Sequence, residues 1–286
     1  MYKLKIERAD GQILTLTQDE SNYQIIDVDG FNPPKAQVNI TGLANFDGGK
    51  FNSAKLDTRA LTLTVKINGD IEKNRLRLYS YVAPKSAVKV YYKNGSRDIY
   101  AEGRVETVEC TAWTNGETAQ IFIICPDSYL KSVEEMVVDI SNTVALFEFP
   151  FYIDLGDPIA FSEYVTDREV NVLNDSEAET GVVISIVFAA SVSEIEIRNV
   201  DTGEFIKLVG TYVEDDRVVI NTNKGSKTVR LIRNGVTTNI FSNVQSGSTF
   251  FQLLPGDNIF SYLADAGASN IVTSVVFSFR NRYMGA

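Results

Sequence analysis

Histidine is absent from the 286 residues of this chain. This absence removes the commonest general base of enzymes and the commonest protein ligand of metal ions. Zinc sites, Ser-His-Asp triads and Cys-His dyads are therefore excluded unless another residue type replaces the histidine. The phosphate-binding patterns GxxxxGK[ST] and GxGxxG are also missing from the sequence.

Cysteine is scarce, and only Cys110 and Cys125 occur. The segment between them predicts a hairpin around Asn115-Gly116, which places Cys110 opposite Ile121. Cys125 then lies four residues further along, about 13 Å away at ~3.3 Å per residue, which is too far for a disulfide. We expect two free structural thiols, consistent with synthesis in the cytosol.

Long apolar runs are missing as well, since none reaches the ~18 residues of a membrane span. We therefore expect no membrane partner. The formal charge of −10 is uneven, because residues 1–138 carry −1 and residues 139–286 carry −9. The acidic part disfavours binding to nucleic acid, and the near-neutral part is the better candidate for self-association.

Hairpin signals and strand-like alternation fill most of the chain. Asp-Gly or Asn-Gly occurs at residues 10–11, 94–95, 115–116 and 234–235, which is the strongest short-range signal for a β-hairpin. In LTLTVKI (61–67), apolar and polar residues alternate strictly. The fold class predicted is all-β with antiparallel strands and one short helix at about 70–83, capped by Asp70 and stopped by Pro84. The cations of that helix suggest either a nucleic-acid patch or, as we favour, a solvated face.

A shift in composition near residues 131–160 predicts a boundary between two domains, 1–138 and 139–286. The second domain shows short strands at 8–12-residue spacing, typical of a β-sandwich. In LLPGDN, Pro255 and Gly256 suit a type II turn between Leu254 and Asp257. Because type II turns splay the flanking strands, we interpret this turn as a corner where the chain changes sheets.

Paired carboxylates are the remaining candidates for chemistry. Glu194 and Glu196 share one face of a predicted strand and could be the paired carboxylates of a hydrolase. However, alternating charged residues are also typical of any solvent-facing strand. The acidic run at residues 214–216 could bind Ca²⁺ or form a solvated turn. Asp154 and Asp157 form the third pair. We expect no catalytic residues, no metal and no cofactor.

Several ordered stretches resemble the distal tail protein family of long-tailed bacteriophages that infect Gram-positive bacteria. These stretches are FDGGKFNSAKLDTRALTLTVKINGD (46–70), IEKNRLRLYSYVAPKSAVKVYY (71–92), AEGRVETVEC (101–110), AQIFIICPDSYL (119–130), LLPGDNIFSY (253–262) and SVVFSFRNRY (274–283). The resemblance implies a tail-tube-like N-terminal β domain followed by a galectin-like β-sandwich. The second half has no His and no Trp, unlike a galectin sugar site, so the likeness would concern shape alone.

The resemblance also implies a structural role at the tail tip of the virion. Six copies would form a ring that joins the major tail tube protein to the hub or tail fibre protein and leaves a channel for DNA. We expect the ring contacts in residues 1–138, with Phe46 and Phe51 of the loop 42–56 at the interface. Alternatively, these two aromatics fold back on their own domain. The competing function is a carbohydrate- or receptor-binding module on a phage or cell surface.

Overall fold

The computed structural model describes residues 2–19, 21–44, 47–111, 117–141, 143–145, 162–164, 169–264 and 272–286. The chain forms two compact units, of which the first contains residues 1–134 and 282–286 and the second residues 135–281. The chain passes between the units four residues before the predicted boundary at 138/139. It returns to the first unit at its last five residues, which the sequence analysis did not expect.

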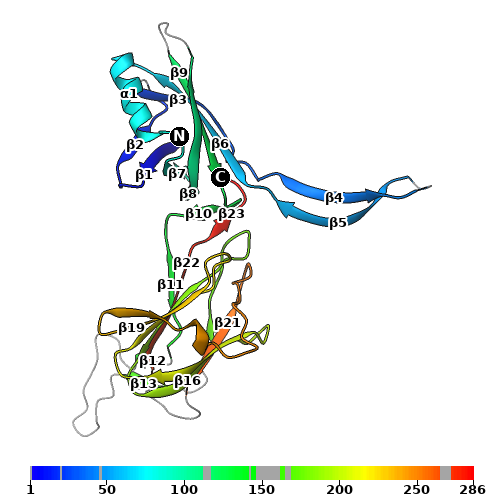
Figure 1. The fold of residues 1–286 in the computed structure, drawn as a ribbon, viewed down its shortest axis with the longest axis vertical. Coiled ribbons are helices and arrows are strands. Elements are labelled where there is room, and N and C mark those ends of the chain that lie inside the picture. The colour runs from blue at the N-terminus through cyan, green and yellow to red at the C-terminus, as the bar shows by residue number, and fades with distance from the viewer. Residues whose placement is uncertain are drawn as a thin grey trace. The chain divides into compact units, whose positions relative to one another are not determined.

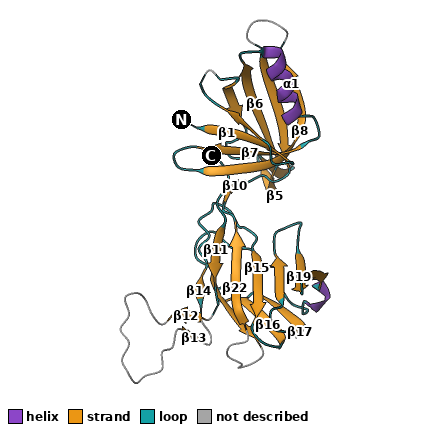
Figure 2. Cartoon of the chain, turned by 90° about the vertical axis from the view of Figure 1, so that its left-hand side faces the viewer, coloured by secondary structure: helices purple, strands orange, loops and turns teal. Residues whose placement is uncertain are grey.

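One sheet builds most of the first unit (Figures 1 and 2). Its main path runs β2-β1-β7-β8-β9-β6-β3, and β10 and β23 pair beside β8. The bounds are β1 Lys3–Arg8, β2 Ile13–Leu16, β3 Tyr23–Asp29, β6 Arg59–Ile67, β7 Ala87–Lys93, β8 Asp98–Cys110, β9 Thr118–Cys125, β10 Leu130–Ser132 and β23 Arg282–Tyr283. The two ends of the path meet, because Thr17 and Ile25 donate backbone hydrogen bonds that bridge β2 and β3. The sheet is thus nearly closed around one core.

Helix α1 (Ile71–Tyr81) confirms the predicted helix. The Asp70 carboxylate accepts a hydrogen bond from the Lys73 amide at 3.2 Å, so it caps the helix as expected. Leu78 and Tyr81 are buried with the sheet core, and Tyr23 donates its hydroxyl to the Asn74 carbonyl. Lys73 and Arg77 are exposed, as expected of a solvated face. The third cation, Arg75, does not fit that expectation, because it is buried and lies 3.5 Å from the Glu117 carboxylate.

A separate two-stranded hairpin leaves the first unit between β3 and β6. It consists of β4 (Ala36–Gly42) and β5 (Gly49–Leu56), which pair only with each other. Figure 1 shows this ribbon extending away from the sheet of its own unit. We refer to residues 36–56 as the arm.

The second unit is a sandwich of a six-stranded sheet, β11-β22-β15-β18-β19-β20, and a four-stranded sheet, β14-β21-β16-β17. Buried residues of both sheets form a single core. The bounds are β11 Met136–Asp139, β14 Val170–Asn171, β15 Val183–Phe188, β16 Val192–Asn199, β17 Phe205–Tyr212, β18 Arg217–Asn221, β19 Thr228–Arg233, β20 Val236–Asn239, β21 Ile259–Ala264 and β22 Val272–Phe279, with a short 3-10 helix at Phe241–Asn243. A small pair, β12 (Thr143–Ala145) and β13 (Ser162–Tyr164), lies apart from both sheets.

The corner at Pro255-Gly256 differs in part from its prediction. Gly256 adopts φ +94°, as the third position of a type II turn requires. The buried Asn258 side chain bonds the backbone of Leu254 and Gly256 and so fixes the turn. However, the corner does not join two strands. The apolar segment 250–254 before it makes only an isolated bridge from Leu253 to Thr180, so the corner leads from an irregular segment into β21.

The hairpin between β8 and β9 has a different register from the predicted one. Cys110 lies opposite Ala119, not opposite Ile121, which pairs with Val108. The predicted turn at Asn115-Gly116 lies outside the described residues. Cys125 is therefore six residues beyond the partner of Cys110, about 20 Å along the strand at ~3.3 Å per residue. Both thiols are free, and burial raises the pKa of Cys125 to about 11.

The last residues of the chain are held in the first unit by two arginines. The buried Arg59 guanidinium donates to the carbonyls of Gly30, Asn32 (2.9 Å), Ser128 (3.0 Å) and Met284 (2.6 Å). Arg97 donates to the Gly285 carbonyl and lies 4.5 Å from the centre of the Tyr283 ring. These contacts join the segment at 30–32, which leads to the arm, to the C-terminal residues.

Candidate functional site: the projecting arm

The arm has one apolar and one polar face. Val38 pairs with Ala54, and Ile40 pairs with Phe51 across a bulge, so these four side chains share a face. Asn39 pairs with Ser53 and Thr41 with Lys50 on the opposite face. Val38, Ile40 and Phe51 are 54%, 59% and 61% exposed. An isolated two-stranded hairpin is marginally stable in water, and exposed apolar patches mark contact surfaces. The arm is therefore the strongest candidate for a binding surface in the described residues.

Phe51, one of the two predicted interface residues, lies on this arm. The segment 42–56, expected to be a loop, is mostly strand β5, because its residues 49–56 pair in register with β4. Phe51 does not fold back on its own unit, since most of its side chain is exposed. Phe46 lies outside the described residues.

Val38 and Ile40 were missed by the sequence analysis, although a signal for them was present. In AQVNITG (36–42) apolar and polar residues alternate without a single charge. Such alternation predicts a strand with one buried face. The sequence alone does not say that the buried face has no cover within the chain.

The candidate carboxylates of the second unit are engaged in ion pairs. Glu194 and Glu196 lie on the outer face of β16, as predicted, and pair with Lys207 at 2.8 Å and with Arg198 at 2.6 Å. Both are half-buried, and their place on the outer face and their cationic partners fit the interpretation of a solvent-facing strand. Asp154 and Asp157 lie outside the described residues.

Asp216 departs from the prediction of a solvated turn. Its carboxylate is only 1% exposed, and it accepts hydrogen bonds from the Arg233 guanidinium and from the Val213 amide at 2.9 Å. The hydrogen bond from Arg233 lowers the pKa of Asp216 despite the opposing effect of burial. Because Asp216 holds the turn between β17 and β18 against β19, its role is structural. Glu214 and Asp215 are exposed.

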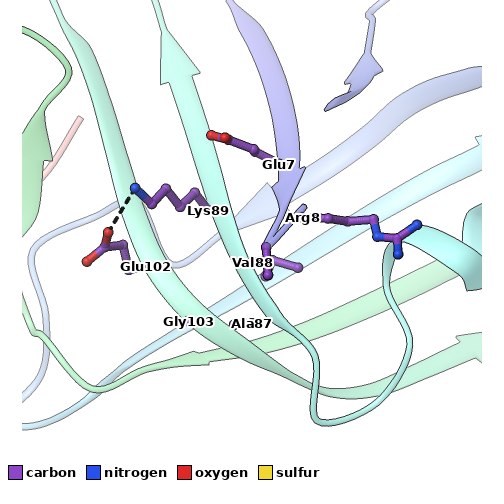
Figure 3. Close-up of a pocket in the computed structure, with 8 residues that line it drawn as sticks. Glu7, Arg8, Ala87, Val88, Lys89, Glu102 and Gly103 are labelled. Carbon is purple, nitrogen blue, oxygen red and sulfur yellow. Dashed lines mark ion pairs between the residues drawn. The ribbon is translucent and has the colours of Figure 1, made fainter. Parts of the chain in front are cut away.

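A cavity of about 350 Å³ opens on the first unit between β1, β7 and β8 (Figure 3). Lys89 and Glu102 meet there at 3.2 Å, and Glu102 also pairs with Lys131 at 3.3 Å. Burial would raise the pKa of Glu102, but these two lysines outweigh burial and the pKa is lowered. Glu102 is therefore held as an anion, a poor state for a general acid. Glu7 accepts a hydrogen bond from the Tyr91 hydroxyl, so this carboxylate is engaged as well.

Neither a metal cluster nor a membrane helix emerges from the described residues. No group of three or more potential ligands among them could hold a metal ion. None of the helices described is long and apolar enough to cross a membrane.

Comparison with known proteins identifies the second unit. Residues 175–283 match the family of the siphovirus-type tail component, C-terminal domain. No curated protein matches the chain.

Solved structures share the fold over nearly the whole chain. The Dit protein (gp 19.1) of phage SPP1 is similar with a TM-score of 0.70 and 16% identity, over 98% of both chains. The baseplate of phage P2 in its activated conformation contains a similar chain in its calcium form (TM-score 0.57, 14% identity) and its strontium form (0.53, 13%), again over 98% of both chains. The family match and the shared fold agree with the resemblance seen in the sequence. Residues 175–283 thus match the C-terminal domain of siphovirus-type tail components, and the chain as a whole shares the fold of the SPP1 Dit protein.

Proposed function

We propose that six copies of this protein form a ring at the tail tip, joined through their first units. The ring connects the tail tube protein to the hub or tail fibre protein and leaves a channel for DNA. The SPP1 protein of the same fold belongs to the hub adsorption apparatus of a phage that infects Gram-positive bacteria, which supports this location. The observation that carries the proposal is the uncovered apolar face of the arm, because such a face needs a protein partner.

The charge distribution favours contacts through the first unit. Counted over the two units, the first carries +1 and the second −11. Side-by-side packing of six strongly acidic units would be opposed by repulsion that salt screens only beyond about 8–10 Å. A near-neutral unit meets no such opposition.

Light scattering and negative-stain microscopy of the purified chain test the ring. A hexamer has a mass of about 190 kDa, six times 31.7 kDa, and six-fold rings should appear. Phe51→Asp should raise the concentration needed for assembly at least tenfold, because it places a charge on the apolar face. Ser53→Asp is the matched control, since Ser53 is exposed on the opposite face of the same strand. A chain that stays monomeric, or rings that form equally well with both variants, would contradict the proposal.

Carbohydrate binding by the second unit remains the second candidate function. In its favour, Phe241 is 45% exposed and stacks on Phe250 at 5.4 Å, and the Lys227 ammonium lies 5.4 Å from the Phe250 ring centre. Exposed aromatic faces can carry sugar rings. Calorimetric titration with host wall polysaccharide, compared between the wild-type chain and Phe241→Ala, distinguishes the two functions. We expect no binding by either protein.

A further inference from the structure

We propose that the apolar face of each arm lies across the outer face of strands β6 and β9 of the next copy in the ring. The inference depends on the proposed ring and names the surface that receives the arm. We call this surface the receiving strip and define it by Ala60, Thr62, Phe122 and Ile124.

The pairing of β6 with β9 places these four residues together. Ala60 pairs with Ile124, and Thr62 pairs with Phe122, on the two adjacent strands. All four side chains point away from the core, since their neighbours Leu61, Leu63, Ile121 and Ile123 are buried. Ile124 is 36% exposed and Ala60 is also exposed. The strip is thus an uncharged area on the solvent face of a sheet, where charged residues are usual.

On the β3 side of the strip the charges complement those of the arm, whereas on the β8 side the exposed Arg104 pairs with Ile124. Asp29 pairs with Thr62, and Asp27 with Thr64, so two exposed carboxylates border the strip along β3. The arm strands contain Lys50 and Lys55 and no acidic residue. Their long side chains can reach around the edge of a two-stranded ribbon. The lysines of the arm therefore suit the β3 border of the strip, where Asp27 and Asp29 lie.

A second copy is the occupant that the geometry favours. The arm extends away from the sheet of its own unit (Figure 1), and every residue of β4 and all of β5 except Leu56 are exposed. In a ring with rotational symmetry each copy contacts one neighbour through its arm and the other neighbour through its receiving strip. One arm and one strip per copy therefore suffice to close the ring. Covering the arm with a second sheet also supplies the packing that a lone hairpin lacks.

Cross-linking between differently labelled copies tests the contact. Sheets that pack face to face lie ~10 Å apart, so a short bis-maleimide is suitable and a direct disulfide is not. One chain carries Ala54→Cys and the other carries Ile124→Cys, both with Cys110→Ser. Cys125 can remain, because it is buried and its pKa is raised to about 11. The two chains are mixed before assembly, treated with the reagent and separated on a denaturing gel.

We expect a dimer band of about 63 kDa, twice 31.7 kDa, that is at least fivefold stronger than with Ser53→Cys in place of Ala54→Cys. Ser53 is the control because it lies one residue away on the polar face. If either substitution prevents folding, Val38→Cys with Phe122→Cys replaces the pair. Rings seen by microscopy without this band would overturn the contact and leave the ring intact. A chain that forms no rings would overturn the proposed function, and this inference with it.

Discussion

At the scale of single residues, buried charges hold the two units in shape. In the second unit Asp216 and Arg233 join the turn after β17 to β19, with a distance of 2.7 Å from Arg233 Nε to the carboxylate. Asp216→Asn keeps the size of the side chain and removes its charge. Since a hydrogen bond to a charged group contributes ~1.5–3 kcal/mol, we expect the free energy of unfolding to fall by about 2 kcal/mol at pH 7.

The pH dependence of that loss follows from the lowered pKa of Asp216. A carboxyl whose pKa is depressed by folding stabilises the protein fully above its unfolded pKa of about 3.9, and the contribution is lost as pH falls through the folded pKa. Denaturant titrations of both chains should therefore differ by a constant amount from pH 7 to about pH 5, and converge in more acidic buffer. Glu214→Gln, at an exposed position two residues earlier, should behave as the wild-type chain.

Arg59 has the same role in the first unit, with four carbonyl partners instead of a carboxylate. Arg59→Lys keeps the charge, but an ammonium has three donors and lacks the planar fork that reaches all four carbonyls. Because carbonyls and a buried charge would then be left without bonds, we expect a loss of at least about 3 kcal/mol.

Thermal and denaturant unfolding of Arg59→Lys would measure this loss. Arg104→Lys is the control, since Arg104 is exposed and donates to the Lys85 carbonyl at 3.1 Å. Equal stabilities of the two variants would mean that the Arg59 contacts contribute little.

At the scale of elements, the arm is separable from the nearly closed sheet of the first unit. The Asp57 amide donates to the Lys35 carbonyl at 2.9 Å, so the two strands are already paired at the base of the arm. Replacing residues 36–56 by Asn-Gly should therefore close a two-residue hairpin between Lys35 and Asp57.

We expect the shortened chain to unfold within about 1 kcal/mol of the wild-type chain, because exposed residues contribute little to the core. Light scattering should show a monomer, since the proposed ring contact has gone. Assembly of the shortened chain into rings would place the contacts elsewhere in the first unit.

At the scale of the whole molecule, the last residues of the chain complete the first unit. A fragment of residues 1–138 lacks β23 and the carbonyls of Met284 and Gly285 that Arg59 and Arg97 bind. A better fragment joins residues 1–132 through a four-residue Gly/Ser linker to residues 281–286. This connection is short because Lys131 and Arg282 pair directly.

We expect the joined fragment to be more stable than 1–138 by about 3 kcal/mol or more, since it restores two hydrogen bonds from charged donors and one strand pairing. Melting curves of the two fragments measure the difference. Equal melting temperatures would show that the C-terminal residues are not needed by the first unit.

Local chemistry made much of this protein predictable. Strict alternation in LTLTVKI placed β6, and Asp70 with Pro84 placed the helix, because helix caps and strand faces depend on neighbouring residues. Asn234-Gly235 formed its expected hairpin, with φ of +50° and +75° at the two residues. The family resemblance was also present in the ordered stretches themselves.

Other features depended on residues far apart in the chain. Asp216 looks like part of a solvated acidic run, and its burial arises from Arg233 on another strand. The segment 250–254 has the composition of a strand, but its one β-bridge within the described residues joins Leu253 to Thr180. Arg59 donates hydrogen bonds to carbonyls of three segments that are distant in sequence, including the C-terminal residues that return to the first unit. The sequence by itself determined most of the strands, the helix and the resemblance to known tail proteins, because those depend on local patterns. Only the tertiary structure decided which apolar faces are covered, and it left that of the arm open, because cover comes from long-range packing that no local pattern records.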